Sequence, residues 1–409
     1  MTSPAQSGVN PDATTEARLR ASSVSRASTA AAGAARPASA ALTPEASGSV
    51  PSPSATATSA PTSSTRAQAL ARAALPLAVL MVLAYLPYVP TELPGILPGR
   101  VNGPGSLQLL ATCLVMGGIA LSYDVLFGRT GLLSFGHALF VAAGSYLLTI
   151  SLSTWSLPLP VAVLLALAIT GVLAVVVGGI ALRVGGIAFA MVTLAFAQAA
   201  SIVVLRNPGG VTGGEEGLTL EREALPSLLV GVANAPYRYW LALAFVTVAW
   251  LVVSLLVRSR AGHAMAAVRE NETRASVLGL GTYRVKLLAI VIGSLLGCLG
   301  GIVHALVLGG SNPHLTTSEF TLALLVMVVL GGAGSTWGAL IGGFLYAYAD
   351  ARLVEVSGSS LLESLPHTIG QVLSQPLFIL GIIFIVVVYF APSGLTGLGG
   401  RLIRKGRST

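Results

Sequence analysis

The feature that most limits the fold of this chain is a succession of long apolar segments between residues 70 and 391. A transmembrane helix needs about 20 mostly apolar residues, because a rise of 1.5 Å per residue has to cross roughly 30 Å of hydrocarbon. Hydrophobic residues make up 54% of the 409 residues and charged residues only 9%, a composition that does not suit a water-soluble surface. The sequence therefore predicts an all-α integral membrane protein.

The apolar segments predict about ten transmembrane helices. The eighth and ninth are short and are joined by the glycine-rich stretch 331–335, so they form either two short spans or one re-entrant hairpin buried in protein. The expected segments are 70–90, 107–127, 131–152, 159–182, 185–205, 237–257, 285–309, 320–333, 335–350 and 377–391.

The ends of the chain differ from this transmembrane domain, which we place at residues 69–395. Residues 1–68 are rich in Ala, Ser, Thr and Pro and predict a disordered tail, and residues 396–409 form a basic tail. The loop 258–286 carries six basic and two acidic residues, and cytoplasmic loops retain Lys and Arg. We therefore expect both termini in the cytoplasm of a multi-pass cell-membrane protein, and the acidic loop that contains Glu215 outside.

The basic loop contains the most informative local pattern. Residues 261–279 alternate apolar and charged side chains at near-helical spacing and end in Gly279, which predicts one short amphipathic helix. Such a helix either docks into a groove on a soluble partner or lies on the lipid surface.

Four ordered blocks of sequence resemble the permeases of branched-chain amino-acid ABC importers, particularly the LivM-like subunit. The segment AVRENETRASVLGL at 267–280 is similar to their coupling segment, and VTGGEEGL at 211–218 is similar to an external loop. The resemblance covers roughly residues 75–395. Besides the coupling segment, the ordered blocks are GRTGLLSFGHALF at 128–140, GGIAFAMVTLAFAQ at 185–198 and LVMVVLGGAGSTWG at 325–338.

This resemblance implies half of a translocation pathway and a set of partners. The expected partners are a second homologous permease, two cytoplasmic ATP-binding subunits and an extracytoplasmic solute-binding protein. The expected substrate is a branched-chain or other small amino acid, with urea or short amides as the alternative. No Gly-Lys pair occurs in the chain, so it lacks a phosphate-binding loop, and we expect no enzyme activity in this subunit. An ion-coupled secondary transporter is less favoured, because acidic residues within the spans are scarce.

The resemblance also assigns roles to the basic loop, which would transmit ATP-driven closure to the spans. We expect Val268, Ala275 and Leu278 to fill a groove on the ATP-binding subunit, and four charged residues to set the register through ion pairs. The complete coupling set is Val268, Arg269, Glu270, Asn271, Glu272, Arg274, Ala275, Leu278 and Gly279.

Polar residues within the spans are candidates for the translocation pathway, because each costs free energy in hydrocarbon unless it is paired or faces a cavity. His137 has two interpretations, hydrogen-bonded packing or pathway lining, and Gln198 faces a pore or bridges helices. Asp124 is expected to form an ion pair with Arg129. No histidines are spaced as paired ligands, so neither a metal nor another cofactor is expected. The candidate pathway set is Ser134, Gly136, His137, Thr193 and Gln198.

Glycines are frequent in the spans, and small residues allow helices to approach closely. Gly293, Gly297 and Gly301 lie on one face of the seventh expected helix, which predicts close packing there. A helix broken at 185–186 or at 331–334, with main-chain groups exposed to substrate, is the functional alternative.

Overall fold

The computed structural model describes residues 76–357, apart from 77, 93–96, 222 and 224, and a few residues between 378 and 397. Nine of the ten expected apolar segments overlap described helices, although residues 70–75 and 77 of the first segment lie outside the described residues. The expected tail at 1–68 lies outside the described residues, as do most of the tenth segment, 377–391, and most of the basic tail.

In this part of the chain, five helices are long and apolar enough to cross a membrane, and they match the second, fourth, fifth, sixth and seventh expected segments. Three shorter apolar helices and α12 complete the set of apolar helices. The five long helices are α3 (Pro104–Asp124), α5 (Leu159–Ala181), α6 (Ile187–Arg206), α7 (Ala235–Arg258) and α10 (Thr282–Leu308). The others are Ala78–Tyr88, α4 (His137–Ser153), α11 (Ser318–Gly331) and α12 (Thr336–Ser357).

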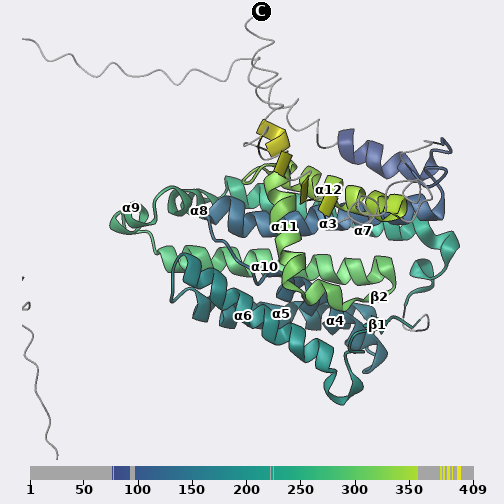
Figure 1. The fold of residues 1–409 in the computed structure, drawn as a ribbon, viewed down its shortest axis with the longest axis horizontal. Coiled ribbons are helices and arrows are strands. Elements are labelled where there is room, and N and C mark those ends of the chain that lie inside the picture. Colours follow the sequence, from purple (N-terminus) through teal and green to yellow (C-terminus); the bar gives the residue numbers. More distant parts are fainter. Residues whose placement is uncertain are drawn as a thin grey trace, which may run out of the picture. The chain divides into compact units, whose positions relative to one another are not determined.

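Helices α3 and α10 form the centre of the helical domain. In each of them 78% of the most apolar stretch of 18 residues is buried inside the protein, whereas in α5, α6 and α7 the buried share of that stretch is 28–33%. Helix α3 packs against α7, α10, α11 and α12, while α10 packs against α3, α4 and α5 (Figure 1). The outer helices therefore present apolar side chains to their surroundings, as expected of helices that face lipid or another membrane subunit.

Close packing of α10 depends on its glycines, as the sequence predicts. Gly301 lies against the main-chain carbonyl of Val141 on α4, and Gly297 lies against the His137 ring. The contact is reciprocal, because Gly144 on α4 lies against the carbonyl of Cys298. A methyl group at Gly301 or Gly144 would overlap main-chain atoms of the other helix, so the two backbones approach as closely as glycine permits.

The two short segments around the glycine-rich stretch form a hairpin of unequal helices. Helix α11 has 14 residues and is therefore about 21 Å long, shorter than the hydrocarbon layer, whereas α12 has 22 residues. The two helices pack against each other, and Gly332 and Gly334 between them have positive φ angles of 112° and 87°. A tight turn thus brings the end of α11 back against the start of α12.

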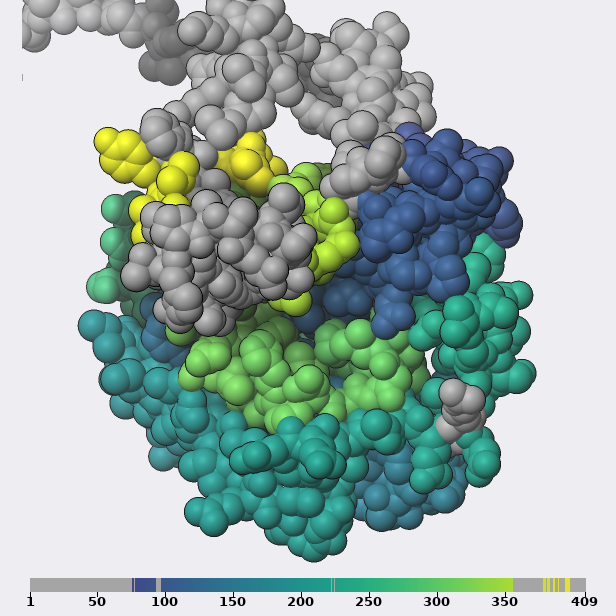
Figure 2. Space-filling model, turned by 45° about the vertical axis from the view of Figure 1, so that its right-hand side comes forward, coloured from purple at the N-terminus to yellow at the C-terminus, as the bar shows by residue number. Residues whose placement is uncertain are grey.

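Short irregular elements gather at the end of the bundle that lies away from α8 and α9. Strand β1 (Leu218–Thr219) pairs antiparallel with β2 (Gly310–Ser311), so the segment after α6 is joined to the segment after α10. Figure 2 shows this end, where green residues after α10 lie next to the teal loop after α6. The 3-10 turns are η1 (Leu86–Tyr88), η3 (Pro208–Gly210), η5 (Ser227–Leu229), η6 (Val232–Asn234) and η7 (Pro313–Thr316).

The packing of α4 on α10 predicts a loss of stability for one glycine substitution and none for a control on α5. Gly301→Ala should lower the free energy of unfolding by about 1–3 kcal/mol, because the added methyl group overlaps the Val141 carbonyl. Gly171→Ala on α5 is the control, since its nearest neighbour would be the Leu295 side chain at 3.6 Å. There the higher helix propensity of alanine should leave stability unchanged or slightly raised. Thermal unfolding of both variants in detergent measures the difference, and equal effects would contradict the packing model.

Candidate functional site

The basic loop folds as two short helices rather than the single helix that the sequence predicts. Helix α8 (Arg260–Glu270) begins where the Ser259 hydroxyl accepts a hydrogen bond from Gly262 N at 3.2 Å. It ends at Asn271, which is extended at φ −161° and whose Oδ1 accepts from Arg274 N at 2.8 Å. Helix α9 (Glu272–Val277) therefore starts from its own cap. Gly279 has a φ of +84° and follows the end of α9, as its expected role as a stop requires.

The apolar side chains of this loop face in two directions. Val268 and Ala275 are 4% and 2% exposed and pack within the chain, so the expectation that they fill a groove on a partner is wrong. Val277 and Leu278, in contrast, are 81% and 77% exposed at the end of α9. The sequence pattern identified the amphipathic character of the loop. Of the three apolar residues that it assigned to the docking surface, Val268 and Ala275 are buried and only Leu278 is exposed.

The charged side chains of the loop also divide into two groups. Arg269 reaches into the helical domain, where its Nη1 donates a hydrogen bond to the carbonyl of Gly128. Glu272 forms an ion pair of 2.5 Å with Lys286 near the start of α10. Glu270 and Arg274 are exposed, and neither belongs to an ion pair in the described part of the chain. Two charges thus attach the loop to its own domain, and two remain on its surface.

Arg269 contacts α3 at the point where this helix ends in a wider turn. Residues Val125–Arg129 form a π-helical turn, and the Thr130 hydroxyl donates to the carbonyl of Leu126 at 2.6 Å. Asp124, which is fully buried, precedes this turn. Its Oδ2 lies 3.3 Å from Arg129 Nε, which confirms the expected ion pair.

Asp124 also connects α3 to the turn between α11 and α12. Its Oδ1 accepts a hydrogen bond from Gly334 N at 2.7 Å, across 210 residues of sequence. A methyl group at Gly128 would overlap Asp124 and Gly334 N, and one at Gly334 would crowd Gly128 and Arg269. Three segments therefore meet at one place, which we call the Asp124 junction: Asp124, Gly128, Arg129, Arg269 and Gly334.

Three of the five candidate pathway residues line one small cavity. Ser134 and Gly136 come from the non-helical stretch before α4, and Thr193 comes from α6. The Thr193 hydroxyl accepts a hydrogen bond from Phe135 N at 3.2 Å, so it holds this stretch against α6. The cavity measures about 10 Å³, which is room for roughly one water molecule. In this conformation the space beside Thr193 is therefore too small for an amino acid.

His137 and Gln198 lie apart from this cavity. His137 is fully buried, with Nε2 at 2.9 Å from the Ser122 hydroxyl and its ring edge-on to Tyr123. Of its two interpretations, the structure shows hydrogen-bonded packing. Gln198 is exposed on α6, and among the described residues it neither bridges helices nor lines the cavity. Among the described residues, no three His, Cys, Asp or Glu side chains are grouped closely enough to hold a metal ion.

Sequence reasoning missed a second buried polar cluster, on α4. The Ser311 hydroxyl lies 2.7 Å from both the Ser145 and the Thr149 hydroxyls. The spacing of four residues between Ser145 and Thr149 was a usable signal for one polar helix face. Ser311 carried no such signal, because the pairing of β2 with β1 places it there.

The ion pair in the Asp124 junction predicts strong thermodynamic coupling. Asp124→Asn or Arg129→Met alone should lower the free energy of unfolding by about 3–5 kcal/mol, because each leaves a buried charge unpaired. The double variant should lose much less than the sum of the two. The matched control is the pair Glu92 and Arg100, whose side chains are 65% and 67% exposed and which should show almost no coupling. Denaturant unfolding in detergent measures both cycles, and additive losses at Asp124 and Arg129 would contradict this assignment.

Comparison with known proteins is consistent with these features. Residues 106–390 match the family model described as "Branched-chain amino acid transport system / permease component". The chain is 26% identical over 317 residues to the high-affinity branched-chain amino acid transport permease protein BraD of Pseudomonas aeruginosa, covering 71% of this chain and 95% of BraD.

Other relatives match over shorter regions. The chain is 26% identical over 158 residues to the probable permease LivM of Methanocaldococcus jannaschii and 37% identical over 108 residues to LivH of Salmonella typhimurium. These matches cover 38% and 25% of this chain, and 45% and 33% of the two relatives. No solved structure matches the chain. Since the family model covers well over half of the residues, this chain is an integral membrane protein that belongs to the permease family of branched-chain amino acid transport systems.

Proposed function

We propose that this chain is one of two permease halves of an ATP-driven importer for branched-chain or other small amino acids. The observation that carries this proposal is the loop of α8 and α9. It exposes an apolar tip, Val277 and Leu278, at one end, and at the other end Arg269 donates a hydrogen bond to the helical domain. A loop built only to connect α7 and α10 needs neither feature. Urea or short amides are the alternative substrates, because the choice of substrate rests on family membership and not on a substrate contact.

The exposed tip of α9 would be the docking surface for an ATP-binding subunit. Val277 and Leu278 are adjacent and exposed, and burying such side chains is favourable by about 1.5–3 kcal/mol each. Glu270 and Arg274 lie beside them as exposed charges of opposite sign that set orientation. The set that docks thus differs from the one that the sequence predicts, since Val277 replaces Val268 and Ala275.

Movement of the ATP-binding subunit would reach the spans through the Asp124 junction. The loop is held at two points, by Arg269 on the Gly128 carbonyl and by Glu272 on Lys286. The first point lies at the end of α3, which packs against α7, α10, α11 and α12. A shift of α8 would therefore act directly on the central helix and on the turn that contains Gly334.

The remaining partners are proposed from the arrangement of the outer surface. Helices α5, α6 and α7 are largely exposed and apolar, so one of these faces would pack on the second permease, with Gln198 on the exposed side of α6. The acidic loop near Glu215 follows α6 at the end of the bundle away from α9, and there it would face an extracytoplasmic solute-binding protein. In this proposed orientation α8, α9 and both termini would lie in the cytoplasm.

An ion-coupled secondary transporter is the competing function. It needs a carboxylate in the membrane domain that is free to exchange an ion or proton. Asp124 is the carboxylate buried at the end of α3; its Oδ1 accepts a hydrogen bond from Gly334 N, and its Oδ2 is ion-paired with Arg129 at 3.3 Å. These contacts favour a structural role for Asp124 and hence the ATP-driven mechanism.

Docking through α9 predicts that a charge at its tip will prevent assembly. Leu278→Glu should reduce copurification of the ATP-binding subunit by at least about tenfold, because the carboxylate would be buried against an apolar groove. Val232→Glu is the control, since Val232 is 68% exposed in η6. Tagged full-length chains expressed with their ATP-binding and permease partners provide the measurement. Equal recovery from both variants would exclude this docking surface.

Transmission through Arg269 predicts a different phenotype. Arg269→Gln should retain the ATP-binding subunit but lower substrate uptake by about tenfold at unchanged ATP hydrolysis, because the loop no longer holds the Gly128 carbonyl at full strength. Arg260→Gln on the same helix is the matched control, since Arg260 is exposed and forms no ion pair in the described residues. Uptake and ATP hydrolysis in proteoliposomes separate the two. Parallel loss of both activities would argue against a transmitting role.

A further inference from the structure

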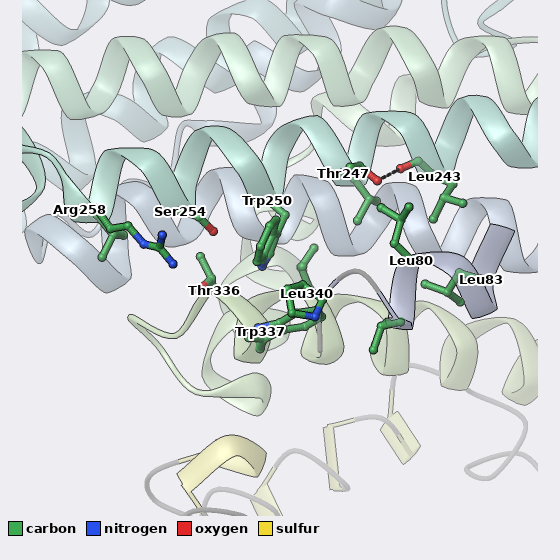
Figure 3. A pocket seen from close by; sticks show the side chains of 14 residues that line it. Leu80, Leu83, Leu243, Thr247, Trp250, Ser254, Arg258, Thr336, Trp337 and Leu340 are labelled. Carbon is green, nitrogen blue, oxygen red and sulfur yellow. Dashed lines mark hydrogen bonds between the residues drawn. The ribbon is translucent and has the colours of Figure 1, made fainter. Parts of the chain in front are cut away.

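A groove of about 500 Å³ lies on the side of the helical domain. Its walls come from three helices, Ala78–Tyr88, α7 and α12, and its volume is within the range of small-molecule sites. Figure 3 shows Trp250 of α7 and Trp337 of α12 facing the same space, with ring centroids 5.7 Å apart. The groove residues belong neither to the Asp124 junction nor to the proposed docking surface on α9.

The lining of the groove changes from polar to apolar along α7. Arg258, Ser254 and Thr336 lie at one end, while Leu80, Leu83 and Leu243 lie at the other. Leu243 and Arg258 are 15 positions apart, which corresponds to about 22 Å along the helix axis. The groove therefore combines a cationic end with a long apolar wall, as a ligand with an anionic head and a hydrocarbon tail requires.

Two hydrogen-bond donors in this groove lack acceptors in the described part of the chain. Arg258 is exposed, has no hydrogen bond or ion pair there, and Figure 3 shows its side chain extending along the groove toward Ser254. The indole Nε1 of Trp250 is buried from solvent and also lacks an acceptor. Guanidinium and indole groups only donate hydrogen bonds, so both call for a ligand rich in acceptor oxygens.

We propose that this groove binds an anionic phospholipid from the membrane leaflet on the Arg258 side. The phosphate would pair with the Arg258 guanidinium, and an ester carbonyl would accept from the indole of Trp250. The acyl chains would lie along Leu80, Leu83 and Leu243. There they would take the place of other membrane lipids, at little cost in free energy. Basic residues in pockets between transmembrane helices recognise lipid head groups in this way.

A protein segment in the groove is the competing occupant, and the chemistry favours lipid. Arg258 stands at the end of α7, where a guanidinium reaches the head-group layer of the bilayer. A packed helix would have to supply an acidic side chain at this depth and an acceptor beside Trp250. A phospholipid carries both groups at fixed positions and is present in excess.

Quenching of the groove tryptophans by brominated lipids tests this proposal directly. The chain has four tryptophans, and Trp155→Phe with Trp240→Phe leaves Trp250 and Trp337 as reporters. The full-length double variant is reconstituted in phosphatidylcholine vesicles that contain increasing fractions of acyl-brominated phosphatidylglycerol or acyl-brominated phosphatidylcholine. We expect half-maximal quenching at an about fivefold lower fraction of the anionic lipid.

Substitutions at Arg258 then identify the source of this preference. Arg258→Gln should make the two quenching curves coincide, and Arg258→Lys should restore most of the difference. Arg260→Gln is the matched control, because Arg260 is exposed two residues away and is not among the groove residues. It should retain the fivefold preference.

The proposal fails if the two lipids quench equally well before Arg258 is changed, or if Arg258→Gln retains the preference. Absence of quenching by either lipid also overturns it, since that result means that protein fills the groove. Should the tryptophan substitutions prevent folding, the phosphatidylglycerol that copurifies with the unmodified chain and with Arg258→Gln is measured by mass spectrometry instead. Equal amounts in the two samples would overturn the proposal. The test requires neither ATP nor substrate, so it is independent of the proposed transport function.

Discussion

The constraint on which this structure depends is that main-chain polar groups in hydrocarbon need hydrogen-bond partners. Regular helices meet it internally, so the informative places are those where a helix stops. The non-helical stretch between α3 and α4 is such a place, and side chains supply its partners. The Thr130 hydroxyl donates to the Leu126 carbonyl, and the Tyr123 hydroxyl donates to the Ser134 carbonyl. The turn between α11 and α12 is another, where Asp124 accepts from Gly334 N. The breaks are therefore individually stabilised, and it is at these breaks that the candidate functional residues lie.

The central packing explains why a local movement at one break is transmitted to the others. Helices α4 and α10 touch main chain to main chain at Gly144 and Gly301, so they offer little free volume for independent motion. Helix α3 is buried along most of its length beside them. The outer helices α5, α6 and α7 lack this confinement and expose apolar surface. The domain thus has a rigid centre that ends at the Asp124 junction and a periphery suited to lipid and to other membrane subunits.

Sequence patterns predicted the parts of this arrangement that depend on local chemistry. The apolar segments, the glycine face of α10 and the pairing of Asp124 with Arg129 all involve residues close together in the sequence or repeated at helical spacing. The division of the basic loop at Asn271 was missed, because hydrophobic periodicity alone favours one continuous helix. The Asn271 side chain instead accepts a hydrogen bond from Arg274 N and so starts a second helix. The burial of Val268 and Ala275 was also missed, since it depends on where α7 and α10 place the loop. The contact of Asp124 with Gly334 spans 210 residues and leaves no local trace.

The end of α3 shows how a docking loop and a membrane domain become energetically linked. The last carbonyl groups of a helix have no following amide to bind, and in a low-dielectric environment an unpaired carbonyl costs free energy. Basic side chains near a helix end satisfy such carbonyls, and usually they come from the same helix. Here the donor to the Gly128 carbonyl is Arg269, which comes from a different element. Displacement of α8 therefore leaves that carbonyl unpaired unless α3 follows it. Because Gly128 and Gly334 have no side chains, Arg269 and Asp124 reach main-chain atoms there. The displacement therefore acts on the backbone itself.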